Sequence, residues 1–178
     1  MVHNKVKQLI CLLQGELYVD IPLFYNNRHN AVRLDLMEID DLKARQIVKS
    51  VLQFLFGKHL FWLCAYGCDS GDIFNNNRLL HSQSEVTVVP YYSSVDRDWF
   101  EYDHDAIACA EISLKTLAID NYLDYVFRLE FLSNTLFLVN VESKVAVHVY
   151  DRRGMDVAAT DPLLLENFKQ QFIQYLQM

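Results

Sequence analysis

The chain has 178 residues and a formal net charge of −7, and 52% of its residues are hydrophobic and 13% aromatic. This composition excludes a disordered chain, which would have few aromatic residues and low hydrophobicity, and the length suits one domain over residues 1–178. No apolar run reaches the roughly 18 residues of a membrane span. We expect a cytoplasmic protein that does not associate with a membrane.

The negative charge comes from the second half of the chain. Residues 1–89 carry nine basic and nine acidic side chains, whereas residues 90–178 carry seven basic and fourteen acidic ones. A negative field repels phosphate backbones, so direct binding to nucleic acid is disfavoured. The same field would speed the encounter with a basic protein.

Hydrophobic periodicity predicts four elements in the first half of the chain. They are a short amphipathic helix over residues 6–13, a half-buried strand over 31–36, a helix over 41–56 and a buried strand over 60–66. Asp40 is a suitable N-cap for the long helix, and Gly57 is suited to end it. The expected buried stripe of this helix consists of Leu42, Val48, Val51, Leu52, Leu55 and Phe56.

The second half alternates strands with two helices. We expect strands over residues 85–92 and 106–114, a helix of about ten residues capped by Asp120, a β-hairpin over 134–142 and 144–150, and a last helix over 162–177. The stripe of the last helix would be Leu164, Leu165, Phe168, Phe172, Ile173 and Leu176. Because the strands cluster, we predict an α+β fold with one mainly antiparallel sheet, helices packed against it and a C-terminal helix.

The stretch from Val145 to Ala159 joins a strand, a polar corner and the entry to the last helix. Val145, Val147 and Val149 would lie on one face of the strand, with Ala146, His148 and Tyr150 on the other. Gly154 is expected to have a positive φ, and Asp161-Pro162 to begin the helix.

Three charged side chains at this corner allow two interpretations. Asp151, Arg153 and Asp156 could form a carboxylate–guanidinium knot that ties the strand to the last helix. Alternatively, two acids beside an arginine could hold a phosphate or a sugar, which would make the chain a small enzyme or a ligand-binding domain. We favour the structural tie.

An acidic, aromatic stretch is the best candidate for a surface that contacts a partner. Residues 96–105 read D-R-D-W-F-E-Y-D-H-D, and Trp99, Phe100 and Tyr102 are residue types that dominate binding energy at interfaces. The candidate contact residues of this acidic belt are Asp96, Asp98, Trp99, Glu101, Asp103 and Asp105, with Asp120 and Asp124 as weaker additions. The alternative is a solvated sheet edge that its charges protect from aggregation.

Other patterns do not predict a catalytic or metal site. Adjacent strand residues point to opposite faces, so Asp103, His104 and Asp105 cannot all reach one ion. The four cysteines Cys11, Cys64, Cys68 and Cys109 lie mostly in apolar runs and are expected to be buried free thiols. We expect no cofactor, no metal and no enzymatic activity.

The polar corner also carries a family resemblance. Tyr150 to Val157 resembles the signature Y-D-D-R-G-x-D near the C-terminus of an uncharacterised bacterial domain family, with Arg152 in place of its second Asp. Pro22 to Tyr25 and Val32 to Leu36 resemble that family's P-L-F-Y and I-R-F-E-L. The resemblance runs from about residue 18 to the end of the chain.

Members of that family occur among immunity proteins of bacterial toxin systems, including contact-dependent growth inhibition. The resemblance therefore implies an immunity protein that binds and neutralises one cognate toxin domain, often a basic nuclease of RNA or tRNA. It implies no catalytic residue. A regulatory protein that binds another component of the host cell is a further possibility.

Overall fold

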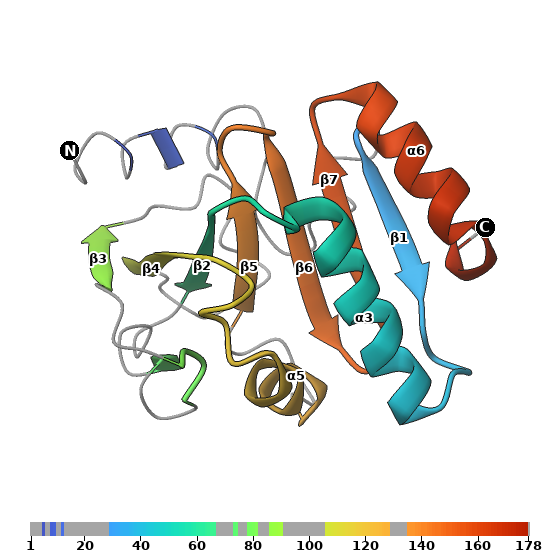
Figure 1. Cartoon of the computed structure of the whole chain (residues 1–178), viewed down its shortest axis with the longest axis horizontal. Helices are drawn as coiled ribbons and strands as arrows, with labels where there is room; N and C mark the ends of the chain where they lie inside the picture. The colour runs from blue at the N-terminus through green and yellow to red at the C-terminus, as the bar shows by residue number, and fades with distance from the viewer. Residues whose placement is uncertain are drawn as a thin grey trace, which may run out of the picture.

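The computed structural model describes residues 29–66, 73–74, 78–81, 86–90, 106–128 and 135–177, together with Lys5, Gln8, Leu9 and Leu12. The elements in chain order are β1 (Ala31–Asp35), α3 (Asp41–Phe56), β2 (Phe61–Tyr66), β3 (Thr87–Pro90), β4 (Ala106–Ile112), α5 (Ile119–Arg128), β5 (Thr135–Asn140), β6 (Val145–Asp151), β7 (Gly154–Ala159), α6 (Pro162–Phe172) and a 3₁₀ turn η3 (Ile173–Tyr175). Figure 1 shows their arrangement.

The seven strands form one sheet in the order β1-β7-β6-β5-β2-β4-β3, and every pair of neighbours is antiparallel. Strands β5, β6 and β7 follow one another as a meander, whereas the chain enters the sheet at one edge with β1 and crosses to β2 through α3 (Figure 1). The predicted α+β fold, with one antiparallel sheet and a C-terminal helix, is confirmed.

Helix α3 begins and ends where its sequence predicts. The Asp40 carboxylate accepts a hydrogen bond from the Lys43 amide at 2.9 Å, and Gly57, with φ of 22°, donates its amide to Gln53 O. The buried stripe holds as predicted from Val48 to Phe56. Leu42 is an error in that prediction, because it lies in the first turn and its side chain is exposed.

The two later helices differ from their predictions at their ends. Helix α5 begins at Ile119, so Asp120 lies in its first turn instead of capping it. Helix α6 begins as predicted, with the Asp161 carboxylate accepting from the Leu163 amide at 2.9 Å. The α-helix ends at Phe172, where the chain tightens into η3, and Ile173 is consequently exposed.

Both faces of the sheet are largely apolar. Helices α3, α5 and α6 pack on the first face, which includes Val145, Val147 and Val149. The second face carries a smaller buried cluster that Leu9 and Leu12 join from the N-terminal part of the chain. Because strand side chains alternate between faces, Ala146 belongs to this second cluster, as the pattern of 145–150 predicts, and Ala158 of β7 belongs to it as well.

One row of side chains crosses the whole second face. The strand registers place one residue of each strand side by side, in the order Thr87, Cys109, Cys64, Phe137, His148, Asp156 and Arg33. Directly opposite residues of an antiparallel pair share a face and touch. The row therefore runs from Thr87 and the two cysteines at one end to the charged residues Asp156 and Arg33 at the other.

Among the residues that the structure describes, no helix is long and apolar enough to cross a membrane.

Candidate functional site

The polar corner is the turn between β6 and β7. The Asp151 carboxylate accepts from the Arg153 amide at 2.6 Å and from Arg153 Nε at 2.8 Å, which closes the turn. The Arg153 carbonyl accepts from the Leu36 amide at 2.7 Å, and Arg152 donates to Ile39 O at 3.3 Å. The turn is thereby fastened to the segment that follows β1.

Asp156 takes part in a separate ion pair. Its two carboxylate oxygens accept from Nε and Nη2 of Arg33 at 2.7 and 2.9 Å, in a bidentate arrangement between β7 and β1. The Asp156 side chain is 0% exposed and that of Arg33 15%. The predicted knot of Asp151, Arg153 and Asp156 is therefore wrong in its pairing, since Asp156 faces Arg33 across the sheet while Arg153 stays on the turn.

Gly154 is required for a different reason from the one predicted. Among the described glycines only Gly57 has a positive φ, so the expectation for Gly154 is wrong. A Cβ at position 154 would collide with the Tyr150 hydroxyl and with the backbone oxygen of Leu34. The glycine thus makes room for the ring of Tyr150 to fold back over the turn.

His148 and Tyr150 continue the polar end of the second face. The His148 ring lies 4.6 Å from the Phe137 ring and 5.8 Å from that of Tyr150, and the Arg33 guanidinium lies 5.3 Å from the Tyr150 ring centre. Burial, together with Arg33, lowers the pKa of His148 to about 3, and burial raises the pKa of Tyr150 to about 12. Both side chains are therefore neutral at pH 7. His148 Nδ1 is buried and has no hydrogen-bond partner within the described part of the chain.

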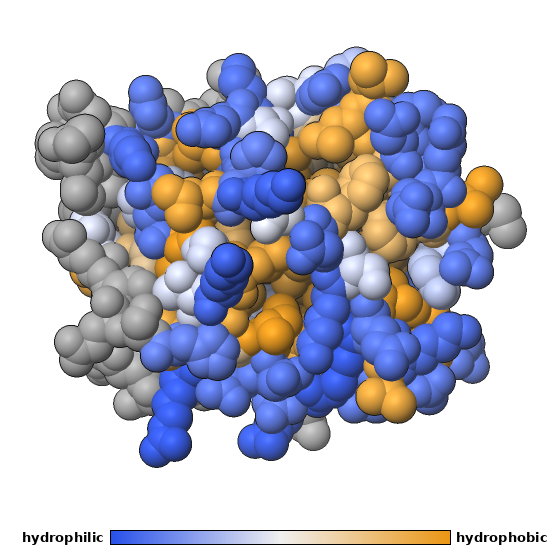
Figure 2. All heavy atoms as spheres, in the orientation of Figure 1, coloured by the Kyte–Doolittle hydropathy of each residue, from blue (hydrophilic) through white to orange (hydrophobic). Residues whose placement is uncertain are grey.

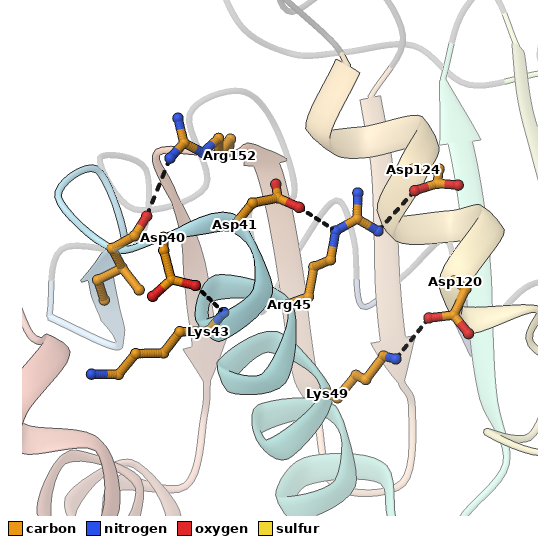
Figure 3. A network of polar contacts seen from close by, with 9 residues as sticks. Asp40, Asp41, Lys43, Arg45, Lys49, Asp120, Asp124 and Arg152 are labelled. Carbon is orange, nitrogen blue, oxygen red and sulfur yellow. Dashed lines mark hydrogen bonds and ion pairs between the residues drawn. The ribbon is translucent and has the colours of Figure 1, made fainter.

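A second group of charges lies on the exposed surface between α3 and α5 (Figure 3). Arg45 bridges Asp41 through Nε and Asp124 through Nη1, both at 2.8 Å, and Lys49 Nζ meets Asp120 at 2.7 Å. We call these five residues the α3–α5 charged surface. In Figure 2, hydrophilic side chains gather in the lower part of the view, where Figure 1 places α3 and α5.

The acids of this surface remain largely in solvent. The Asp120 side chain is 74% exposed and that of Asp124 48%. The hydrogen bond from Lys49 lowers the pKa of Asp120, and the hydrogen bond to Asp41 raises the pKa of Arg45. Asp120 and Asp124 are thus accessible and one helical turn apart on α5.

The structure describes only part of the predicted binding surface, namely Asp120 and Asp124. The acidic belt of residues 96–105 lies outside the described residues, as do Cys11 and Cys68. Cys64 and Cys109 are buried free thiols, as expected. Within the described ranges, no group of three or more His, Cys, Asp or Glu side chains is arranged to hold a metal ion.

Three residues that form ion pairs at these sites were not among the predicted site residues. Arg33 is one, although its outward position in an alternating strand marks it as polar-facing, and Arg45 and Lys49 are the others. Arg45 follows Asp41 at a four-residue step on α3, and opposite charges at this spacing are a detectable signal of an ion pair. Lys49 pairs with Asp120 of α5, a contact that no local pattern on α3 indicates.

Comparison with protein families gives one match. The family model described as "Domain of unknown function (DUF3885)" matches residues 14–177. No curated protein and no solved structure matches the chain significantly.

Proposed function

The chain belongs to the DUF3885 family, and from this premise we propose that it is an immunity protein that binds and neutralises a cognate bacterial toxin domain. The partner we favour is a basic nuclease of RNA or tRNA. The protein would cover the active site or the path of the substrate and would itself catalyse no reaction. The resemblance of Tyr150 to Val157 to a domain family with members among immunity proteins supports this proposal.

The observation that carries the proposal is the exposure of acidic side chains on α5. Asp120 and Asp124 belong to the half of the chain that holds fourteen acidic and seven basic side chains. Their ion pairs with Lys49 and Arg45 are partly solvated, and such surface pairs stabilise a protein by about 0.2–1 kcal/mol. A lysine or arginine of a partner can therefore replace Lys49 or Arg45 at little cost.

The polar corner supports a structural tie better than an active site. Each of its carboxylates already accepts hydrogen bonds from an arginine, Asp151 from Arg153 and Asp156 from Arg33. A bound phosphate or sugar would have to displace a guanidinium from a carboxylate. Displacement from Asp156 would leave a fully buried charge, which is strongly unfavourable.

A nuclease offers chemistry that fits an acidic inhibitor. Its substrate cleft is lined with cations that hold phosphate groups, and carboxylates can satisfy those cations and exclude the RNA. In this proposal Asp120 and Asp124 act together with the belt residues Asp96, Asp98, Glu101, Asp103 and Asp105, and Trp99 supplies an aromatic anchor.

A growth-rescue experiment tests the proposal. The partner is sought in the reading frame upstream, where we expect a large secreted protein that ends in a basic toxin domain. Expression of that domain should arrest growth, co-expression of this chain should restore it, and the two proteins should co-purify. Failure of the chain to restore growth or to bind the domain would contradict the proposal.

A matched pair of variants locates the surface. Asp120→Asn/Asp124→Asn removes two charges from α5, and Glu142→Gln/Glu166→Gln removes two exposed charges elsewhere. We expect the first variant to bind the toxin domain about tenfold more weakly and the second to bind like the native chain. Equal binding by both would exclude α5 from the contact.

A further inference from the structure

Two cysteines face each other on neighbouring strands near the β3 edge of the sheet. Cys64 of β2 and Cys109 of β4 are directly opposite in the antiparallel register, and both belong to the row of side chains that crosses the second face. Both are fully buried free thiols. On the other side of Cys64, the row continues with Phe137. Within the row, each cysteine therefore has the other as its one sulfur-containing neighbour.

The register alone satisfies the main distance requirement of a disulfide. Opposite residues of an antiparallel pair have Cα atoms about 4.5 or 5.5 Å apart, and both values lie within the roughly 4.4–6.8 Å that disulfides span. Their Cβ atoms, about 4.5–5.5 Å apart, need to approach only slightly to reach the bonded distance. We infer that Cys64 and Cys109 are a modification site. A small disulfide oxidant would convert these two thiols into a disulfide that joins β2 to β4.

The reaction is an ordinary double exchange. The Cys109 thiolate attacks one sulfur of the oxidant, such as glutathione disulfide, and releases one thiolate; the Cys64 thiolate then attacks Cys109 Sγ and releases the second. Two protein thiols lose two protons and two electrons, and the oxidant is reduced to two thiols. No other reactant is needed.

The surroundings make this reaction slow in the folded protein. Burial raises the pKa of Cys109 to about 11. Burial, together with the neighbouring Cys109, raises the pKa of Cys64 well above its ordinary value. Cys109 Sγ also donates to Thr87 O at 3.5 Å, and Leu9 and Leu12 belong to the same buried cluster. Thiolate must form before it can attack, so the exchange waits for local opening of the sheet.

The test compares two routes to the oxidised protein in a Cys11→Ser/Cys68→Ser background, which leaves only the two cysteines of interest. In one arm the folded protein is incubated with glutathione disulfide. In the other, the denatured protein is refolded in a mixture of reduced and oxidised glutathione, so that access is not limiting. Peptide mapping without reduction then reports whether residues 64 and 109 are linked.

We expect the cross-link in the refolded arm and its slower appearance in the folded arm. Linking the strands should raise the melting temperature by about 5–10 °C. A Cys64→Ala variant in the same background should give no intrachain link. The inference would be overturned if Cys64 and Cys109 of the refolded Cys11→Ser/Cys68→Ser protein stay free, or if they carry glutathione and do not form the disulfide.

Discussion

Two carboxylate ion pairs of nearly equal length have opposite surroundings. Arg33–Asp156 and Lys49–Asp120 are both 2.7 Å long, but the first has side chains 15% and 0% exposed, and the second 43% and 74%. In the first, water cannot replace a lost partner. In the second, water or a partner protein can. The comparison indicates that the buried pair stabilises the fold, whereas the exposed pair is accessible to the partner that we propose.

The physical basis is the cost of an unpaired charge. A buried carboxylate or guanidinium that loses its partner keeps its desolvation penalty, whereas an exposed one regains water. The same reasoning separates the corner around Asp156 from the α3–α5 charged surface.

The largest effect is expected from breaking the buried pair. Asp156→Asn leaves the Arg33 guanidinium without its carboxylate and should lower the free energy of unfolding by about 3–5 kcal/mol, measured by urea denaturation. Replacing both partners, as in Arg33→Met/Asp156→Leu, should recover most of that loss, because neither buried charge then remains without the other. A loss below about 1 kcal/mol in Asp156→Asn would contradict a structural role for the pair.

Acid should destabilise the protein through His148. Its pKa is about 3 when folded and about 6.5 when unfolded, so below pH 6.5 the unfolded chain binds a proton that the folded chain does not. Stability is therefore lost as the pH falls from about 6.5 towards 3, by about 2 kcal/mol at pH 5. The upper part of this range, from about pH 6.5 to pH 5, lies above the ordinary pKa of carboxylates, which is about 4.

His148→Leu provides the control for this pH dependence. Urea titrations at pH 6.5 and pH 5 should show a smaller difference in unfolding free energy for the variant than for the native chain. An unchanged difference would mean that another group causes the acid sensitivity.

A methyl group at position 154 should disturb the same buried corner. Gly154→Ala places a Cβ against the Tyr150 hydroxyl and Leu34 O and should cost about 1–3 kcal/mol of stability. In a Tyr150→Phe background the hydroxyl is absent while Leu34 O remains, so the cost of the alanine should be smaller but not zero. An equal cost in both backgrounds would show that the hydroxyl does not contribute.

The smallest effect on stability is expected at the exposed pair. Lys49→Gln removes the cation beside Asp120 and should change the free energy of unfolding by less than about 0.5 kcal/mol. The variant should bind the toxin domain at least as tightly as the native chain, because Asp120 is then free to pair with the partner. A large loss of stability would show that the Lys49–Asp120 pair stabilises the fold, which would contradict this prediction.

Local patterns were sufficient to predict most of the fold. Asp40, Gly57 and the Asp161-Pro162 pair mark helix ends through hydrogen bonds to nearby backbone groups, and these predictions are confirmed. The alternation of 145–150 likewise predicted a strand with distinct faces. The strand order was not predictable, because pairing β2 between β4 and β5 depends on contacts between distant segments.

The candidate site was less predictable for the same reason. The acids of the corner were recognised, but the partner of Asp156 is 123 positions away on β1, so no local pattern connects them. The conformation of Gly154 was also misjudged, since its need for space arises from a side chain that folds back and from a neighbouring strand. The binding role of Asp120 and Asp124 stays a prediction.

The most direct test of the account is the salt dependence of association. The association rate constant of the protein with its toxin domain is measured by stopped flow between about 0.01 and 0.5 M salt, where the Debye length falls from about 30 Å to only a few ångströms. We predict at least a tenfold decrease for the native chain and a shallower dependence for Asp120→Asn/Asp124→Asn. A rate constant that does not change with salt would contradict recognition through acidic side chains.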